Sequence, residues 1–110
     1  MTIKVYSIEE MRQKLIPIFE KYGLLKASLF GSYARDEAKS DSDVDLLIYL
    51  DESFELEKYL RFETSLKRVL KKKVDVVEYR CINGFMRDDI MKEAILLYEC
   101  EGQKAASYNN

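Results

Sequence analysis

The chain has 110 residues, of which 18 are Lys or Arg and 20 are Asp or Glu, and it contains no histidine. This length supports one small domain with a single hydrophobic core. The absence of histidine excludes a Ser-His-Asp triad, a Cys-His pair and an imidazole base. Cys81 and Cys100 are the only cysteines, too few for the common zinc sites, and we expect reduced thiols. Any catalysis at neutral pH must therefore use carboxylates, hydroxyls, backbone amides, cationic side chains or an oxygen-bound metal ion.

The net charge of −2 argues against an extensive nucleic-acid-binding surface, which normally makes a domain strongly basic. The N-terminal segment lacks the apolar stretch of a signal peptide, and no apolar run reaches the roughly 18 residues of a membrane span. We therefore expect a cytoplasmic protein with no membrane partner. We expect one domain over residues 1–101 and a polar, disordered tail over residues 102–110.

The first predicted helix begins after Ser7 and ends near Gly23. Ser7 and Glu10 have the spacing of a capping box, and glycine is favoured just beyond a helix end. Apolar residues between these two points recur at helical spacing. Pro17 lies inside the stretch and lacks a backbone donor, so we expect a kink or an early break there.

Residues 24–30 and 43–50 are predicted strands. In the second strand the even positions are all apolar, whereas the odd positions begin with Asp43 and Asp45. Because side chains alternate along a strand, one face belongs to the core and the other face carries two carboxylates.

The second half of the chain predicts a helix over residues 55–72, a strand over 74–79 and a last amphipathic helix over about 85–99. The helix over 55–72 begins with acids and ends with bases, which complements its dipole, although a partner-facing or nucleotide-facing basic patch is the alternative. Asp75 lies among the valines of the strand. The expected fold is α/β of the α+β type, a small mixed sheet with helices packed on one side.

Gly31 and Ser32 end the first predicted strand and precede a helix-compatible stretch. Glycine lets the backbone approach a ligand closely, and a serine at a turn can bind a phosphate oxygen. A plain turn is the alternative interpretation of this pair.

Asp43 and Asp45 point to the same face of their strand, where two carboxylates repel each other unless a cation joins them. Mg²⁺ or Mn²⁺ suits such oxygen ligands, and Asp75 offers a third acid for a two-metal site. A solvated strand edge with spare acids is the alternative. A calcium EF-hand over residues 41–52 is disfavoured, because Leu46 stands where that loop needs glycine.

Residues 31–46 read GSYARDEAKSDSDVDL. This segment resembles the signature of the nucleotidyltransferase superfamily typified by DNA polymerase beta, in which Gly-Ser at a strand end is followed by Asp-x-Asp on the next strand. Ala34, Arg35 and Ser42 extend the similarity to the minimal nucleotidyltransferases of prokaryotes. Asp36 departs from the pattern, because many relatives carry glycine there, and it leaves the geometry of this turn open.

The resemblance implies that Gly31 and Ser32 bind the phosphates of ATP, and it places Arg35 and Ser42 beside them in the nucleotide site. For Arg35, a surface ion pair with nearby acids is the alternative. The resemblance also implies that three acids hold two Mg²⁺ ions, with Mn²⁺ as a substitute, and carry the catalysis. These acids are Asp43, Asp45 and Asp75.

The resemblance further implies a function and a partner. Small members of this kind resemble antitoxins that transfer AMP from ATP to a tyrosine of a HEPN ribonuclease toxin, which is then silenced. Two alternatives stay open. The same fold can neutralise a toxin by stoichiometric contact, or it can act as a nucleotidyltransferase on a small molecule or an RNA end.

Overall fold

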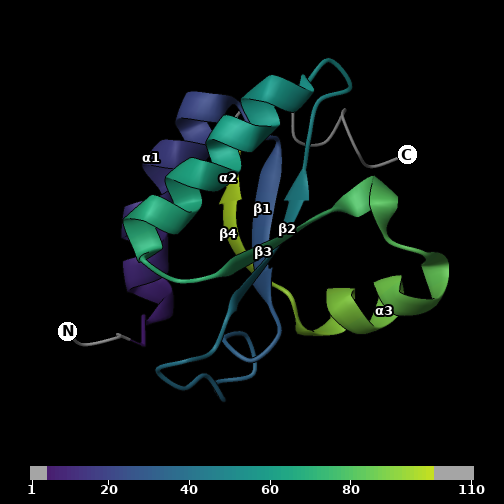
Figure 1. Ribbon diagram of the computed structural model, residues 1–110. Helices are drawn as coiled ribbons and strands as arrows, with labels where there is room; N and C mark the ends of the chain where they lie inside the picture. Colours follow the sequence, from purple (N-terminus) through teal and green to yellow (C-terminus); the bar gives the residue numbers. More distant parts are fainter. Residues whose placement is uncertain (1–4, 101–110) are drawn as a thin grey trace.

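A computed structural model describes residues 5–100, and the tail expected over residues 102–110 lies outside this part. Its centre is a four-stranded sheet in the order β3-β2-β1-β4. The elements follow the chain as α1 (Ile8–Tyr22), β1 (Lys26–Phe30), β2 (Val44–Tyr49), α2 (Leu56–Leu70), β3 (Val74–Glu78), the 3₁₀ turn η1 (Tyr79–Cys81), α3 (Gly84–Glu93) and β4 (Ile95–Glu99) (Figure 1). Across residues 5–100, no helix is long and apolar enough to cross a membrane.

Helix α1 begins and ends where the sequence predicts. The Ser7 hydroxyl accepts a bond of 3.1 Å from the Glu10 amide, and the Glu10 carboxylate accepts one of 2.9 Å from the Ser7 amide. Gly23 follows the last turn with a left-handed φ of 69°, a conformation that glycine adopts without strain. The helix continues through Pro17, so the early break does not occur. Its apolar face is buried against the sheet, which offsets the lost backbone bond.

Strand β2 lies inside the sheet and sets its register. It pairs antiparallel with β1 and parallel with β3, while β1 pairs antiparallel with β4, so the sheet is mixed as expected. The even residues of β2 are fully buried against α1 and α2: Val44, Leu46 and Ile48. The alternation read from the sequence therefore places the core face correctly.

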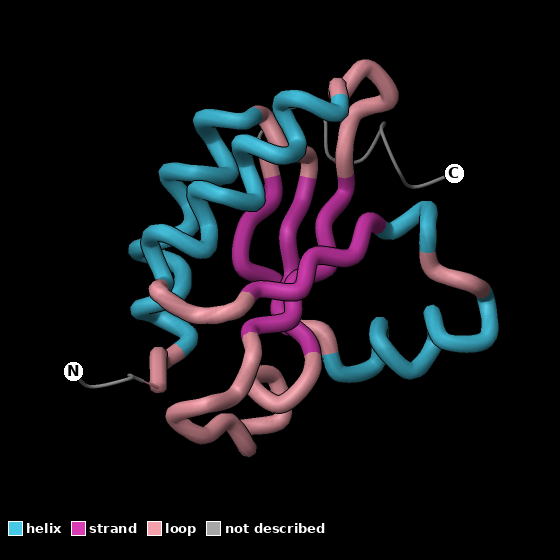
Figure 2. The backbone as a smooth tube through the Cα atoms, in the orientation of Figure 1, coloured by secondary structure: helices cyan, strands magenta, loops and turns pink. Residues whose placement is uncertain are grey.

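The two faces of the sheet are covered unequally. Figures 1 and 2 show α1 and α2 side by side on one face, as the sequence predicts. The short helix α3 lies on the opposite side of the strands, which differs from the expected one-sided arrangement. There Ile90 and Ile82 pack against Leu47 and Tyr49, two odd residues of β2. Part of the face that carries the acids is thus covered as well.

The helix predicted over residues 85–99 is wrong beyond Glu93. Helix α3 ends there, and β4 begins at Ile95 and pairs along the free edge of β1. The apolar spacing of this segment fits a helix, but backbone bonds to β1 favour a strand, and the Cys100 amide adds a bond of 3.0 Å to the Leu25 carbonyl. Tertiary pairing overrides local periodicity here.

The packing of α3 on the sheet is tested by two substitutions in this helix. We expect Ile90→Ala to lower the free energy of unfolding by about 2 kcal/mol or more, because it leaves a cavity beneath α3. We expect Met86→Ala, at a side chain 53% exposed, to change it by no more than about 0.5 kcal/mol. Urea denaturation measures both values. Equal losses for the two variants would contradict the placement of α3.

Candidate active site

The turn after β1 and the first residues of β2 and β3 meet at one end of the sheet, where the long loop joining β1 and β2 also lies (Figure 2). Phe30, at the end of β1, pairs with Asp45 because these two strands are antiparallel. Asp45 in turn pairs with Asp75, because β2 and β3 are parallel and in register. Sheet topology therefore brings Gly31, Asp45 and Asp75 to neighbouring positions.

The three predicted acids differ in exposure. Asp75 is exposed, Asp45 is half-buried, and the Asp43 side chain is 42% exposed with its carboxylate 3.8 Å from the Lys73 ammonium. Burial raises the pKa of Asp45 to about 6, and repulsion from Asp75 and Asp43 adds to this effect. The three carboxylates therefore lie near enough to repel one another. Within residues 5–100, however, no group of three or more such side chains converges into an arrangement that could hold a metal ion.

Gly31 is required by the position of Asp45. Its φ is +75°, and a Cβ placed on it would lie 2.9 Å from Cγ of Asp45 and collide with the carboxylate. Any larger residue would push the acid out of place. Close approach by a carboxylate of the same chain is therefore a reason for this glycine, and the predicted approach of a phosphate ligand stays a prediction.

The segment after Gly31 is a turn rather than the short helix that its composition allows. The Arg35 amide donates to the Gly31 carbonyl at 3.1 Å, and the Glu37 amide donates to the Ser32 carbonyl at 2.9 Å. Asp36 has a left-handed φ of 61°. Asp tolerates this conformation better than most residues, so it can occupy a position where glycine would be the easiest choice.

Arg35 takes part in the ion pairs foreseen as the alternative to phosphate binding. Its Nε donates to Glu37 at 3.0 Å, and its Nη1 donates to Glu93 at 3.1 Å. Glu37 and Glu93 together raise the pKa of Arg35 above its ordinary value. Contact between Arg35 and a nucleotide stays a prediction.

Glu93 is the residue of this region that sequence reasoning missed. Besides its bonds to Arg35, its carboxylate accepts a bond of 2.8 Å from the Gly31 amide. It was missed because it lies inside the segment wrongly predicted as one long helix. The sequence carried no signal for it, because the helix predicted over residues 85–99 places Glu93 away from a helix end.

Ser42 closes the loop before β2. Its hydroxyl accepts a bond of 2.8 Å from the Lys39 amide, and its own amide donates to the Lys39 carbonyl at 3.0 Å. Lys72, beyond the end of α2, donates to the Ser40 carbonyl at 2.7 Å. The structure therefore gives Ser42 a role in loop shape, and its predicted place in the nucleotide site stays untested.

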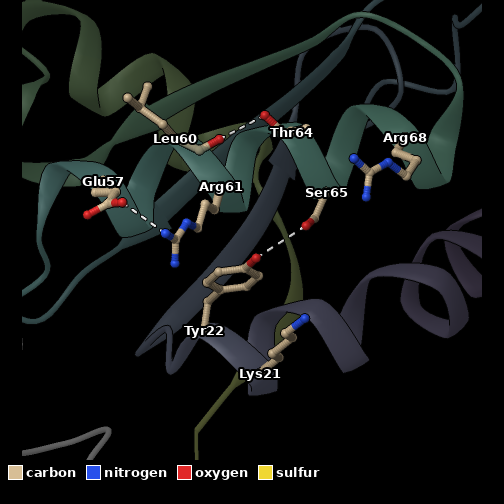
Figure 3. Close-up of a pocket in the computed structure, with 8 residues that line it drawn as sticks. All are labelled: Lys21, Tyr22, Glu57, Leu60, Arg61, Thr64, Ser65 and Arg68. Carbon is tan, nitrogen blue, oxygen red and sulfur yellow. Dashed lines mark hydrogen bonds and ion pairs between the residues drawn. The ribbon is translucent and has the colours of Figure 1, made fainter.

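A depression of about 390 Å³ lies between α1 and α2 (Figure 3). Arg61 binds Glu57 there at 2.8 Å, and the hydroxyls of Tyr22 and Ser65 lie 3.3 Å apart. The basic residues of α2 and the turn after it are thus divided: Arg61 and Arg68 line this depression, whereas Lys72 and Lys73 reach the loop beside the acids.

The model of the polymerase beta nucleotidyltransferase family matches residues 13–103. The chain belongs to this family. Membership of the polymerase beta nucleotidyltransferase family confirms the resemblance carried by residues 31–46 and the expected fold class. It makes the chain a nucleotidyltransferase, with a nucleotide as its substrate class.

Relatives of the chain carry more specific names. A candidate protein adenylyltransferase of Methanocaldococcus jannaschii, MJ0435, is 43% identical over 89 residues, which cover 81% of this chain and 96% of that protein. The protein adenylyltransferase MntA of Thermococcus cleftensis is 34% identical over 76 residues, which cover 69% and 77%. A similar fold, at 16% identity and a TM-score of 0.65, occurs in the solved complex of the tri-AMPylated HEPN toxin of Shewanella oneidensis with MNT antitoxin, covering 93% of this chain and 84% of that one.

The collision at Gly31 can be separated from backbone strain by comparing two glycines. Gly23 has a left-handed φ of +69°, but a Cβ added to it would meet nothing within 4 Å, so we expect Gly23→Ala to show strain alone. That strain costs about 1 kcal/mol of unfolding free energy. We expect Gly31→Ala to cost at least about twice as much, because it adds the collision with Asp45. Urea denaturation gives both values, and equal losses would contradict the steric role of Asp45.

Burial of Asp45, together with its repulsion by Asp75 and Asp43, predicts a pH dependence of stability in buffer with a chelator. The pKa of Asp45 is about 6 in the folded chain against an ordinary 3.8, so both states are protonated below 3.8. As the pH rises from 3.8 through 6, the unfolded chain loses its proton first, and the folded chain loses stability. We expect Asp45→Asn to remove this loss, so that its stability relative to wild type increases with pH.

Thermal denaturation between pH 4 and pH 8 measures this difference, and the exposed acid Asp41 supplies the control variant Asp41→Asn. A stability difference between Asp45→Asn and wild type that does not change with pH would contradict the raised pKa of Asp45 in the folded chain.

Proposed function

We propose that this chain is a Mg²⁺-dependent protein adenylyltransferase that transfers AMP from ATP to a tyrosine of a HEPN ribonuclease toxin and thereby acts as its antitoxin. One observation carries the proposal: Asp45 and Asp75 lie in register beside the Gly31 turn in a chain of the nucleotidyltransferase family. The names of the two archaeal relatives support a protein acceptor and AMP as the transferred group. The Shewanella complex supports a HEPN toxin as that acceptor.

The chemistry of the donor set fits a hard divalent cation, although the three carboxylates do not converge in this structure. Asp43, Asp45 and Asp75 offer only carboxylate oxygens, which are the ligands that Mg²⁺ prefers. A cation would also reverse the electrostatics that raise the pKa of Asp45, since attraction would replace repulsion. These three acids would hold the ion, with Asp43 exchanging its distant contact to Lys73 for the metal. When bound, Mg²⁺ neutralises phosphate charge and makes the attacking hydroxyl more acidic.

The side chains of the turn would bind and orient the triphosphate. Ser32, a half-buried residue next to Gly31, offers a hydroxyl, and Arg35 offers a guanidinium that is positively charged at any physiological pH. Both lie on the turn that follows β1 and therefore beside Asp45. Donors held in place before the reaction stabilise developing negative charge better than mobile water does.

Access for a protein acceptor follows from the position of Asp75. This acid is exposed on β3, which is an edge strand of the sheet. A tyrosine hydroxyl of a partner can reach the edge without entering the core, and the Asp75 carboxylate can accept its proton as the hydroxyl attacks the α-phosphorus. The new bond joins the tyrosine oxygen to that phosphorus, and pyrophosphate leaves.

The proposal is tested by the mass of the partner. After incubation of the complete chain with a HEPN toxin, ATP and MgCl₂, we expect the toxin to gain one or more AMP units and to lose ribonuclease activity. Asp43→Asn combined with Asp45→Asn should abolish the gain, and so should a chelator. Asp41→Asn, at an exposed acid of the preceding loop, should leave it unchanged.

Two results would overturn the proposal in favour of its alternatives. Neutralisation that survives the double substitution with no change in toxin mass would indicate a stoichiometric binding protein. Transfer of AMP to RNA or to a small molecule, with none to the toxin, would indicate a different acceptor.

A further inference from the structure

Sheet topology places the end of α3 against the Gly31 turn. Strand β4 runs antiparallel to β1, with Leu29 paired to Ile95, so the residues before Ile95 lie beside the residues after Leu29. Glu93, the last residue of α3, therefore reaches Gly31 across a sequence separation of 62 residues. Its side chain is 27% exposed, so this carboxylate is largely enclosed.

The Glu93 carboxylate joins the two ends of the turn. One oxygen accepts from the Gly31 amide at 2.8 Å, and both oxygens lie within bonding distance of Arg35 Nη1, at 3.1 and 3.3 Å. The Arg35 amide already donates to the Gly31 carbonyl at 3.1 Å. Gly31, Arg35 and Glu93 thus form a closed ring of hydrogen bonds, and charge-assisted bonds of this kind fix direction as well as distance.

The ring leaves one nitrogen of the Arg35 guanidinium without a hydrogen-bond partner among residues 5–100. Nε is bound to Glu37 and Nη1 to Glu93, while Nη2 makes no hydrogen bond to any other group of residues 5–100. A guanidinium held by two of its nitrogens presents the third in a fixed direction, which suits recognition of a phosphate oxygen.

The ion pair between Glu93 and Arg35 by itself contributes little to stability. An ion pair with a partner about half exposed is typically worth less than about 1 kcal/mol. The charge of Glu93 also opposes the dipole at the end of α3 and adds to the repulsion around Asp45. The effect of an acid at residue 93 that these costs leave unexplained is that it holds the Gly31 amide and the Arg35 guanidinium in place.

We propose that Glu93 is a positioning residue for the nucleotide: it fixes the Gly31 amide and the Arg35 guanidinium so that Arg35 Nη2 and the Ser32 hydroxyl face the triphosphate. Glu93 itself does not touch the nucleotide. This inference rests on the proposed function and extends it to a residue on a separate element, α3.

The experiment measures nucleotide binding apart from transfer. The dissociation constant of a non-hydrolysable ATP analogue is determined by calorimetry with MgCl₂ for the complete chain and three variants. We expect Glu93→Ala to weaken binding by about tenfold and to raise KM in parallel, with a smaller effect on kcat, because the Gly31 amide and the Arg35 guanidinium are no longer held in place before the nucleotide binds. Glu93→Gln keeps an acceptor oxygen for the Gly31 amide and should recover most of the affinity.

Glu37→Gln is the matched control. It removes the charge beside Arg35 but keeps an amide oxygen that can accept from Arg35 Nε, and it leaves the bond between Glu93 and Gly31, so its dissociation constant should stay within about twofold of wild type. Thermal denaturation of each variant shows whether it folds.

Three results would overturn the inference. If Glu93→Ala lowers the melting temperature but binds the analogue like wild type, the residue is structural only. If either Glu93 variant binds more tightly, the carboxylate competes with phosphate instead of preparing its site. If wild type binds no triphosphate, the proposed function fails and this inference fails with it. If wild type binds the analogue and either of the first two results is obtained, this inference alone is overturned.

Discussion

The burial of Asp45 beside other acids, held in place by the core, is the constraint on which the site depends. The residues on either side of Asp45 along β2, Val44 and Leu46, are fully buried beneath α1 and α2. The strand cannot turn Asp45 toward solvent without exposing them, so the acid stays beside Asp75 with its pKa raised to about 6. Burial of apolar surface thus maintains an arrangement of charges that is unfavourable by itself.

Other features of the site follow from the position of Asp45. Its carboxylate leaves no space for a Cβ at residue 31, which explains the glycine and its left-handed φ. Gly31 then directs its amide toward Glu93, which in turn holds Arg35. Residues from β1, β2 and the end of α3 are therefore coupled through short contacts, although they lie far apart in the sequence.

The sequence predicted features whose causes are local. Ser7, Glu10 and Gly23 bound α1 through caps that involve near neighbours, and alternation along β2 identified its two faces. It failed at the junction of α3 and β4, because the apolar spacing after Glu93 fits a helix and only pairing with β1 selects a strand. Glu93 was missed for the same reason, since its contact with Gly31 depends on that pairing. The left-handed turn at Asp36 also requires the folded loop to be seen.

The loop joining β1 and β2 has a consequence for how such proteins can diverge. Residues 37–42 are held by turns and by a lysine that binds a backbone carbonyl, so insertions or deletions there need not disturb the sheet. One residue added or removed within β2 would instead exchange its buried and acidic faces and destroy folding and chemistry together. Length changes in evolution, and in laboratory attempts to redirect the acceptor, are therefore expected to accumulate in this loop and to be absent from the strand beside it.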